Sequence, residues 1–433
     1  MNLLSDWLAY LESLHPKGQD GVELGLERVN RVKAALQQTQ RCPLIIVGGT
    51  NGKGSTCAFL EVIYSFAGYR IGCYTSPHLI DYNERVRVDR QAVDDATLCR
   101  AFARVEAARQ AAGELALTYF EFGTLAAWEV FAQRKVEVLI LEVGLGGRLD
   151  AVNAYDADCA VVTGIALDHT DWLGSTREAI GFEKAGIYRQ GKPAICADPQ
   201  PPQSLVDHAL AIGADLQRIG CDFGYTDENA QWTFWARATA RRAELPIPAL
   251  RGAVQLGNAA AALAVVERLK ERLPVSLAAI VRALGAVRLP GRFEVLPRAP
   301  GAPTVVLDVA HNPQAVAALA ENLSAGSFAK TIAVVGMLAD KDIAGSLAAL
   351  AGKIDIWLLA RLDIPRGASA EVLAEALANF VGDGQLGGTV ESFASPAAAF
   401  ARAARLAGED DRIVVFGSFH TVAAVMRSIN TGA

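Results

Sequence analysis

Short apolar segments rich in β-branched residues alternate with longer helical patterns along the chain, and this alternation limits the fold more than any other feature. The segments that read as buried strands are 43–48, 70–75, 137–143, 159–165, 192–197, 304–310, 330–336, 354–360 and 412–417. The stretches that read as helices include 52–67, 120–134 and 257–272. Buried strands that alternate with helices indicate an α/β fold, in which helices cover a mostly parallel sheet.

The chain of 433 residues is too long for one ordinary hydrophobic core, so more than one domain is expected. A stretch rich in Pro, Gly and Arg interrupts the alternation near residue 290. We therefore predict a larger N-terminal domain over 1–290, a linker over 291–303 and a smaller C-terminal α/β domain over 304–433, with the active site in the cleft between the domains. Residues 213–250 also depart from the pattern and read as short antiparallel strands.

Composition and charge exclude several classes of protein. An apolar fraction of 52% with 20% charged residues is typical of a well-packed globule, not of a disordered chain. A net charge of −6 argues against nucleic acid or an anionic membrane as a partner. The N-terminal segment carries acidic residues, unlike a secretory signal, and no apolar run is long enough to span a membrane. The seven cysteines lack C-x-x-C spacing and read as reduced thiols, which indicates a cytoplasmic protein.

The segment Pro43–Ile63 runs from an apolar strand through a glycine-rich turn into a helix, which is the layout of a phosphate-binding loop. The standard spacing G-x-x-x-x-G-K-[ST] fails twice, because Val47 stands where the first glycine belongs and Gly54 follows Lys53. The N–H groups of such a turn and the positive end of the helix still favour phosphate binding. The alternative is a plain glycine turn with a solvated lysine.

Two further predicted strands end beside side chains that suit a metal ion. Glu142 closes the strand 137–143, and His169 follows the strand 159–165. A carboxylate supplies the oxygen ligand that magnesium prefers, and histidine can bind a metal or contact phosphate. The alternatives are a surface glutamate in a glycine-rich loop and a loop histidine that is satisfied locally.

Polar residues also follow predicted strands in the C-terminal half. Asp308 and His311 close one such strand, while Arg292 and Asn258 lie near the predicted domain junction. Four of the six histidines occupy positions after strands, namely His78, His169, His311 and His420. This distribution favours one shared cleft over four unrelated loops.

A set of motifs occurs in one order along nearly the whole chain: GGTNGKGST, YTSPHL, LTYFEFGTLAAWEVF, LEVGLGGRLDAVN, ALDHTDWLG, EKAGI, LPGRFEVL, DVAHNP, GMLADKD and FGSFHTVA. Together they resemble the bifunctional dihydrofolate synthases/folylpolyglutamate synthases, which are Mur-ligase-like ATP-dependent amide ligases. In that family the loop reads G-T-N-G-K-G-[ST], and Gly49–Ser55 matches every position. The resemblance implies a P-loop-type ATPase domain followed by a Rossmann-like domain, and it explains both departures from the standard loop.

The resemblance also implies roles for individual residues. The implied ATP-binding residues are Gly49, Thr50, Asn51, Gly52, Lys53, Gly54, Ser55, Asn258, Arg292 and Asp308. The implied catalytic residues are Lys53, His169, Lys184 and His311. The implied magnesium ligands are Ser76, Glu142, His169 and Lys184, where Lys184 matches a lysine that the family carbamylates and so turns into an anion. The implied pteroate pocket consists of Glu23, Leu24, Gly25, Leu26, Thr118, Tyr119, Phe120, Glu121, Leu149, Asp150 and Ala151.

The implied activity is the ATP-dependent addition of L-glutamate to 7,8-dihydropteroate, which forms dihydrofolate, and to the γ-carboxyl of reduced folates, through an acyl phosphate. ATP and two magnesium ions are the expected cofactors, and a monovalent cation is left open. The other expected partners are small molecules, namely dihydropteroate, reduced folates and L-glutamate. Neither nucleic acid nor a membrane is expected, and the protein is expected to be a monomer.

Four alternatives remain open. An enzyme limited to extending glutamate chains would share the ATP and metal motifs. Another Mur-type ligase would share the loop, but it normally carries an N-terminal UDP-binding domain, for which residues 1–42 leave no room. A pure ATP switch would lack the acceptor pocket, and a non-catalytic pteridine-binding module would not need Lys53, Glu142 and His169 together.

Overall fold

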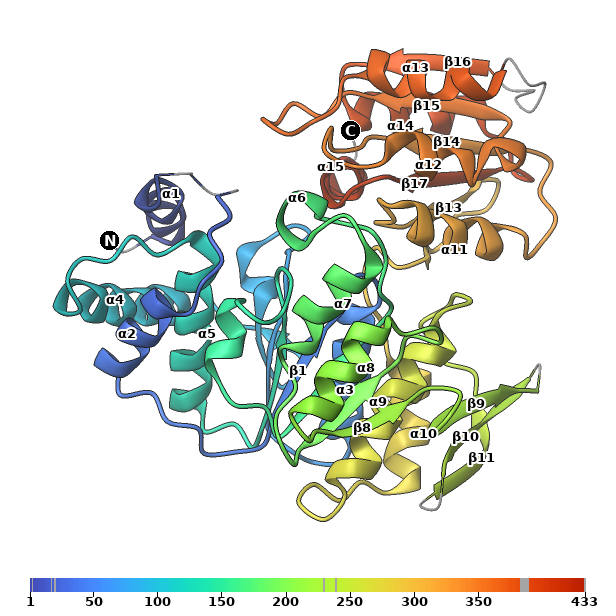
Figure 1. Ribbon diagram of the computed structural model, residues 1–433. Helices are drawn as coiled ribbons and strands as arrows, with labels where there is room; N and C mark the ends of the chain where they lie inside the picture. Colours follow the sequence, from blue (N-terminus) through green and yellow to red (C-terminus); the bar gives the residue numbers. More distant parts are fainter. Residues whose placement is uncertain are drawn as a thin grey trace. The chain divides into compact units, whose positions relative to one another are not determined.

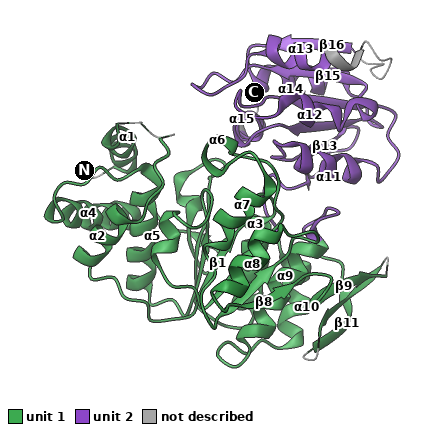
Figure 2. Cartoon of the chain, in the orientation of Figure 1, with its two compact units in different colours: residues 1–249, 256–287 green, residues 250–255, 288–433 purple. Residues whose placement is uncertain are grey.

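The structure is a computed structural model that describes residues 1, 3–16, 18, 21–228, 230–237, 240–381 and 389–431 (Figure 1). The chain divides into two compact units (Figure 2). The first consists of Met1–Ala249 and Leu256–Val287, and the second of Leu250–Gln255 and Arg288–Ala433. Part of the stretch 291–303, which was predicted to be a linker, forms strand β12 (Glu294–Val295) of the second unit. Which ligands each predicted domain binds stays a prediction.

The first unit is built on an eight-stranded sheet with the strand order β4-β3-β2-β5-β1-β6-β7-β8. Its strands are β1 (Leu44–Gly48), β2 (Ile71–Tyr74), β3 (Val86–Val88), β4 (Gln91–Ala92), β5 (Val138–Glu142), β6 (Cys159–Val162), β7 (Pro193–Cys196) and β8 (Asp215–Arg218). Strand β3 pairs antiparallel with β2 and with β4, and the other pairs of this sheet are parallel. The mostly parallel sheet confirms the predicted fold class. Because β5 and β6 flank β1 on opposite sides, chain connections diverge at the carboxyl end of β1, where open α/β sheets bind ligands.

The helices of the first unit pack against this sheet or against one another. They are α1 (Leu4–Leu14), α2 (Glu27–Ala35), α3 (Lys53–Phe66), α4 (Asp95–Ala111), α5 (Tyr119–Arg134), α6 (Thr170–Leu173), α7 (Arg177–Ala185), α8 (Gln203–Ala211), α9 (Gln255–Leu269) and α10 (Leu277–Ala286), with the 3-10 turns η1 (Tyr82–Arg85) and η2 (Ala151–Ala154). Helix α3 packs against β1, β2, β5 and α10, whereas α4 packs along α1, α2 and α5. Within the part of the chain that the structure describes, no helix combines the length and apolar character needed to cross a membrane.

The segment 213–250 only partly follows the prediction. Three of its strands form a separate antiparallel sheet, namely β9 (Phe223–Asp227), β10 (Gln231–Ala236) and β11 (Ala240–Pro246). Strand β8, however, pairs parallel with β7, because helix α8 carries the chain back to the edge of the main sheet. The connections through residues 229 and 238–239 lie outside the described residues.

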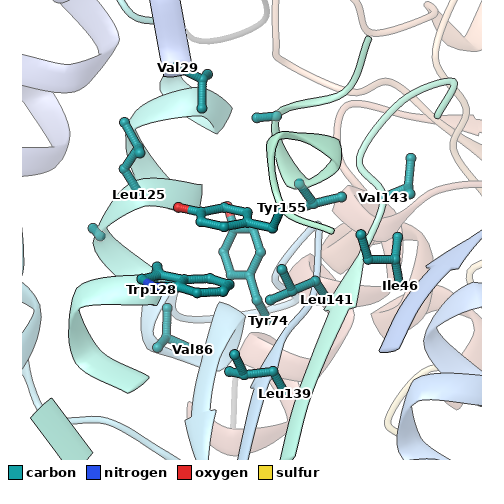
Figure 3. Close-up of a cluster of buried hydrophobic side chains, with 14 of the residues drawn as sticks. Val29, Ile46, Tyr74, Val86, Leu125, Trp128, Leu139, Leu141, Val143 and Tyr155 are labelled. Atoms are coloured by element: carbon teal, nitrogen blue, oxygen red, sulfur yellow. The ribbon is translucent and has the colours of Figure 1, made fainter. Parts of the chain in front are cut away.

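An aromatic stack anchors the core of the first unit (Figure 3). The rings of Trp128, on α5, and Tyr155, just after η2, lie 3.8 Å apart at an interplanar angle of 5°. Leu139 and Leu141 of β5 and Val29 of α2 surround the stack in the same buried cluster. Large aromatic pairs contribute strongly to packing. The stack therefore fixes the end of the loop 143–154 against α5.

The second unit contains a six-stranded sheet with the order β12-β13-β17-β14-β15-β16. Besides β12, its elements are β13 (Thr304–Leu307), α11 (Pro313–Leu323), β14 (Thr331–Val335), α12 (Ile343–Ala348), η3 (Ala351–Lys353), β15 (Ile356–Ala360), α13 (Ala370–Val381), β16 (Thr389–Phe393), α14 (Pro396–Leu406), β17 (Arg412–Phe416) and α15 (Phe419–Thr431). All pairs except β12–β13 are parallel. Since β17 lies between β13 and β14, the loops that follow β13 and β17 are neighbours.

Candidate functional site

The loop after β1 follows a path that requires glycine at two positions. Gly49 has a φ of +136°, and a Cβ atom there would overlap the side chain of Thr163. Gly52 has a φ of +93°, and a Cβ atom there would lie 2.5 Å from Oδ1 of Asn258. Residues with a side chain rarely adopt either conformation. The loop is therefore tightly curled, and Asn258, one of the predicted ATP contacts, lies directly against it.

The loop is also fixed to the segment after β6. The Thr50 N–H donates to the carbonyl of Gly164 at 2.7 Å. The Thr50 hydroxyl donates to the carbonyl of Ala166 at 3.2 Å and accepts from the Ala166 N–H at 3.1 Å. Helix α3 begins at Lys53, so its first turn presents the positive end of the helix dipole to this loop. This arrangement suits an anion such as phosphate.

Two lysines converge on one carbonyl of the loop. Nζ of Lys53 donates to the carbonyls of Gly49 and Thr50, each at 3.1 Å. Nζ of Lys184, which is buried on α7, donates to the carbonyl of Gly49 at 2.9 Å. Burial, together with repulsion from Lys53, lowers the pKa of Lys184 to about 7, against opposing attraction from Asp168 and Asp150. Lys184 thus exists partly as a neutral amine near pH 7, a state that an ordinary surface lysine does not reach.

The structure joins two of the four predicted metal ligands. Glu142 is buried at the end of β5, and its Oε2 accepts the N–H of Ser76 at 3.1 Å. A buried carboxylate at the carboxyl edge of a parallel sheet suits a hard cation. In the first turn of α3, after the phosphate loop, the Thr56 hydroxyl is buried and has no hydrogen-bond partner among the described residues. These oxygens are compatible with magnesium at this edge of the sheet.

His169 occupies a more exposed position. It caps α6 with a φ of +52°, and its Nε2 lies 3.9 Å from Oδ2 of Asp168. Asp168 in turn acts electrostatically on Lys184. Within the described ranges, no group of three His, Cys, Asp or Glu side chains is arranged to hold a metal. The predicted set contains only two such side chains, so it depends equally on the Ser76 hydroxyl and on a modified Lys184.

The three segments of the predicted pteroate pocket adjoin one another in the first unit. The Gly25 N–H donates to the carbonyl of Leu149 at 3.2 Å, which joins the segment 23–26 to the segment 149–151. Thr118 and Glu121 cap α5 reciprocally, each accepting the backbone N–H of the other. The structure therefore places the predicted pocket residues as neighbours, although they are distant in the sequence.

Arg28 connects these segments, although no motif in the sequence predicts a role for it. Its guanidinium donates to Oε1 of Glu121 at 2.9 Å, to the carbonyl of Glu23 at 2.9 Å and to the Glu23 carboxylate. His15 approaches the same Glu23 carboxylate at 3.2 Å. The position of Arg28, two residues after the predicted segment 23–26, was the available signal.

Asp150 lies where the pocket approaches the loop lysines. Its carboxylate accepts the N–H groups of Leu145 at 2.8 Å and Val152 at 3.0 Å. Burial raises its pKa to about 7, although these N–H groups and Lys53 favour the charged form. Asp150 is also the residue that caps the start of the 3-10 turn η2.

The second unit gathers its own predicted residues at the carboxyl end of its sheet. The Asp308 carboxylate accepts the N–H groups of Phe293 at 2.9 Å and Ala310 at 2.8 Å, and burial raises its pKa against the attraction of Arg292. Nδ1 of His311 lies 2.9 Å from the carbonyl of Val309 and must donate to it, since a carbonyl only accepts.

Phe419, for which the sequence predicts no role, links two predicted residues of the second unit. Its ring lies 5.0 Å from the guanidinium carbon of Arg292 and 6.4 Å from the ring of His311. The pairing of β13 with β17 explains this contact, because Phe419 directly follows β17. The FGSFHTVA motif contains Phe419, but it gives no indication of which residue would face His311.

Comparisons with known proteins show the family of the chain. Residues 291–419 match the family described as Mur ligase, glutamate ligase domain. The chain is 47% identical to the dihydrofolate synthase/folylpolyglutamate synthase of Escherichia coli over 99% of this chain and 96% of that protein.

Solved structures show the same similarity. Escherichia coli FolC in complex with DHPP and ADP is similar with a TM-score of 0.91 and 45% identity, over 99% of this chain and 98% of the other. A bifunctional folylpolyglutamate synthase/dihydrofolate synthase with Mn, AMPPNP and L-glutamate bound is similar with a TM-score of 0.89 and 45% identity, over the same shares. The chain therefore belongs to the dihydrofolate synthase/folylpolyglutamate synthase family.

Proposed function

We propose that the protein is an ATP-dependent ligase that joins L-glutamate to 7,8-dihydropteroate, forming dihydrofolate, and to the γ-carboxyl of reduced folates. The observation that carries the proposal is the convergence of Lys53 and Lys184 on the Gly49 carbonyl, with Asp150 of the predicted acceptor pocket acting on both lysines. A nucleotide loop and an acceptor pocket that adjoin in this way suit the transfer of a phosphoryl group from ATP to a substrate carboxylate.

The reaction needs activation because hydroxide is a poor leaving group. One oxygen of the acceptor carboxylate attacks the γ-phosphorus of ATP, ADP leaves, and an acyl phosphate forms. The neutral α-amino group of L-glutamate then attacks the carbonyl carbon and loses a proton. The tetrahedral intermediate collapses, and phosphate leaves with the oxygen that bridged it to carbon. The products are the amide, ADP and phosphate.

The residues of the loop would supply charge and position for the first step. The N–H groups of Gly49–Ser55 and the start of α3 would cradle the phosphates, and Lys53 would offset the charge that develops on them. Asn258, which contacts the loop at Gly52, would fix the nucleotide beside it. Arg292 and Asp308 of the second unit would make further ATP contacts, and His311 would lie beside the nucleotide.

Ser76, Glu142, His169 and a carbamylated Lys184 would hold magnesium, which when bound neutralises phosphate charge. Two ions are proposed, and a monovalent cation is left open. The carbamate requires a neutral amine, and the lowered pKa of Lys184 supports it. We further propose that the protein acts as a monomer in the cytoplasm, where its seven free cysteines would stay reduced.

Release of ADP tests the proposal. The purified protein receives ATP, magnesium, L-glutamate and either dihydropteroate or tetrahydrofolate, and each component is left out in turn. The expected result is ADP release that requires glutamate and occurs with both acceptors. Activity with tetrahydrofolate alone would indicate an enzyme limited to chain extension. ADP release that is indifferent to acceptor and glutamate would contradict the ligase assignment.

A further inference from the structure

Arg85 is a buried arginine that forms no ion pair with any of the described residues. It ends η1 with 8% of its surface exposed. Its Nε donates to Nδ1 of His78 at 2.8 Å, its guanidinium acts electrostatically on the Tyr74 hydroxyl, and in the described ranges no carboxylate pairs with it. The guanidinium carbon faces two aromatic rings, at 5.3 Å from Tyr82 and 5.5 Å from Tyr119.

Such an environment is unfavourable for a group that cannot lose its charge. Arginine stays protonated in proteins, and buried charges are normally paired. Contact with aromatic rings recovers only part of the lost hydration. Arg87 on the same hairpin shows the ordinary solution, because its guanidinium binds both carboxylate oxygens of Glu61 at 2.9–3.1 Å. The hairpin therefore satisfies one arginine and leaves its neighbour without a counter-ion.

The surroundings of Arg85 connect two parts of the candidate site. Its carbonyl accepts the N–H of Thr75 at 3.0 Å, and His78 follows the predicted metal ligand Ser76 by two residues. Tyr119 belongs to the predicted pteroate segment 118–121. The guanidinium thus lies between the turn that would hold metal and the helix that would hold the pteridine.

A further polar group in this cluster lacks a partner. The hydroxyl of Tyr82 is buried without a hydrogen bond to any described residue. It lies close to the backbone of Gly123, where a Cβ atom would be only 2.6 Å from it. A guanidinium without a counter-ion beside a buried phenol without a hydrogen bond is an arrangement that a bound ligand would complete.

We propose that Arg85 binds a carboxylate of the acceptor substrate. The inference rests on the proposed function, in which the acceptor carries a pteridine at one end and a carboxylate at the end that reacts. The planar guanidinium of arginine can form two parallel hydrogen bonds with a carboxylate. The carboxylate of the bound acceptor would then be the counter-ion that Arg85 lacks. Arg85 would thereby orient the acceptor between the pteridine pocket and the phosphate loop.

Two carboxylates have this chemistry. One is the reacting carboxylate, which both acceptors possess. The other is the α-carboxylate of the glutamate tail, which only a folate possesses. Turnover of Arg85→Met with each acceptor distinguishes them, because loss with both indicates the reacting carboxylate and loss with tetrahydrofolate alone indicates the tail.

The decisive experiment is a binding cycle on the full-length protein with magnesium and ADP. Wild type, Arg85→Met and the control Arg100→Met, which removes an exposed arginine on α4, are titrated with dihydropteroate and with an analogue that lacks the carboxylate. Arg85→Met should weaken dihydropteroate binding roughly 10- to 100-fold, as expected for losing charge-assisted hydrogen bonds, and leave the affinity for the analogue unchanged. Arg100→Met should change neither affinity. Tetrahydrofolate is titrated as well, to test the tail.

The outcomes separate the possible explanations. The inference is wrong if Arg85→Met weakens the binding of dihydropteroate and of the analogue without the carboxylate equally. It is also wrong if the variant weakens the binding of neither tetrahydrofolate nor dihydropteroate. The Tm of Arg85→Met should not fall, because the variant removes an unpaired buried charge. If this variant does not fold, Arg85→Lys decides, since it keeps the charge but not the fork and should weaken only the carboxylate ligands. A wild-type protein that ligates neither acceptor would refute the proposed function instead.

Discussion

Nζ of Lys184, on α7, donates a 2.9 Å hydrogen bond to the carbonyl of Gly49, the residue that opens the phosphate loop. Lys53 donates to the same carbonyl at 3.1 Å, so two amines lie close together in a buried place. The helix and the loop are held together by this contact. Burial, together with repulsion from Lys53, lowers the pKa of Lys184 and makes that amine a nucleophile near neutral pH.

Lys184 should form a carbamate with dissolved carbon dioxide. Its pKa of about 7 instead of 10.5 means that the neutral amine increases as the pH rises through 7, whereas an ordinary lysine would remain charged. Protein exchanged into ¹³C-bicarbonate should therefore show a carbamate carbon resonance that grows across this range and is missing in Lys184→Ala. A spectrum without this resonance at any pH between about 6 and 9 would show that the lysine stays unmodified.

The same shift predicts how stability depends on pH. Between about pH 7 and 10.5 the unfolded chain carries a proton on Lys184 that the folded chain has lost. The contribution of this residue to the free energy of unfolding should therefore rise with pH across that window. Lys184→Met should be stabilised relative to wild type most at or below pH 7, measured by urea denaturation without bicarbonate. An equal difference at all pH values would contradict the shifted pKa.

Lys53→Ala should strongly reduce both ligase activities and leave the fold intact. The residue begins α3, and among the described residues its Nζ donates to the loop carbonyls of Gly49 and Thr50, so its removal costs one phosphate contact rather than core packing. A fall in kcat/KM of roughly 10²–10³ is expected for the loss of a charge that stabilises the transition state. Lys330→Ala, at an exposed position of the second unit, serves as the control and should retain activity. Retained turnover in the Lys53 variant would refute the assignment of the loop.

Gly52→Ala and Gly68→Ala form a matched pair. Both glycines have a φ of +93°, so alanine is equally strained at each. Only at Gly52 would the new methyl group meet a neighbour, Oδ1 of Asn258, whereas nothing lies within 4 Å at Gly68. Gly52→Ala should therefore lose on the order of 100-fold in kcat/KM for ATP through displacement of the loop, while Gly68→Ala loses only stability. Similar kinetics for the two variants would show that the loop is not held in this way.

The strand and helix order could be predicted from the sequence because buried parallel strands are uniformly apolar. Segments such as 43–48 and 159–165 correspond to β1 and β6 within a few residues. Strand β16 (Thr389–Phe393) was missed, since it is a half-exposed edge strand without an apolar run. Strand β8 was given the wrong pairing for a similar reason, because its partly exposed residues carry no mark of the parallel sheet.

The residues of the candidate site could be predicted from the sequence, but the contacts between them could not. Motifs pointed to Lys53, Glu142 and Lys184, yet no local pattern indicated that two lysines would share the Gly49 carbonyl. Arg28 and Arg85 escaped notice because a lone arginine between motifs looks like a solvated residue. Their burial and their partners come from long-range packing of α5 against α2 and of η1 near Tyr119.

Arg28→Met should impair the acceptor and spare ATP. Arg28 is the residue that holds the segment 23–26 against Glu121, and its side chain is 21% exposed. Losing it leaves a buried carboxylate without its cation, so a loss of about 1–3 kcal/mol in stability and a raised KM for dihydropteroate are expected. Arg31→Met, on the same helix but bonded to the Ala112 carbonyl, is the control. An unchanged KM for dihydropteroate would mean that these segments do not form the pteridine pocket.

Transfer of oxygen from the acceptor tests the central claim most directly. Dihydropteroate labelled with ¹⁸O in its carboxylate is incubated with the protein, ATP, magnesium and L-glutamate, and the inorganic phosphate is analysed by mass spectrometry. An acyl phosphate passes its bridging oxygen to the departing phosphate, so one ¹⁸O atom should appear in phosphate for each dihydrofolate formed. Phosphate that carries no label, or ADP formation without dihydrofolate, would contradict the proposed ligase mechanism.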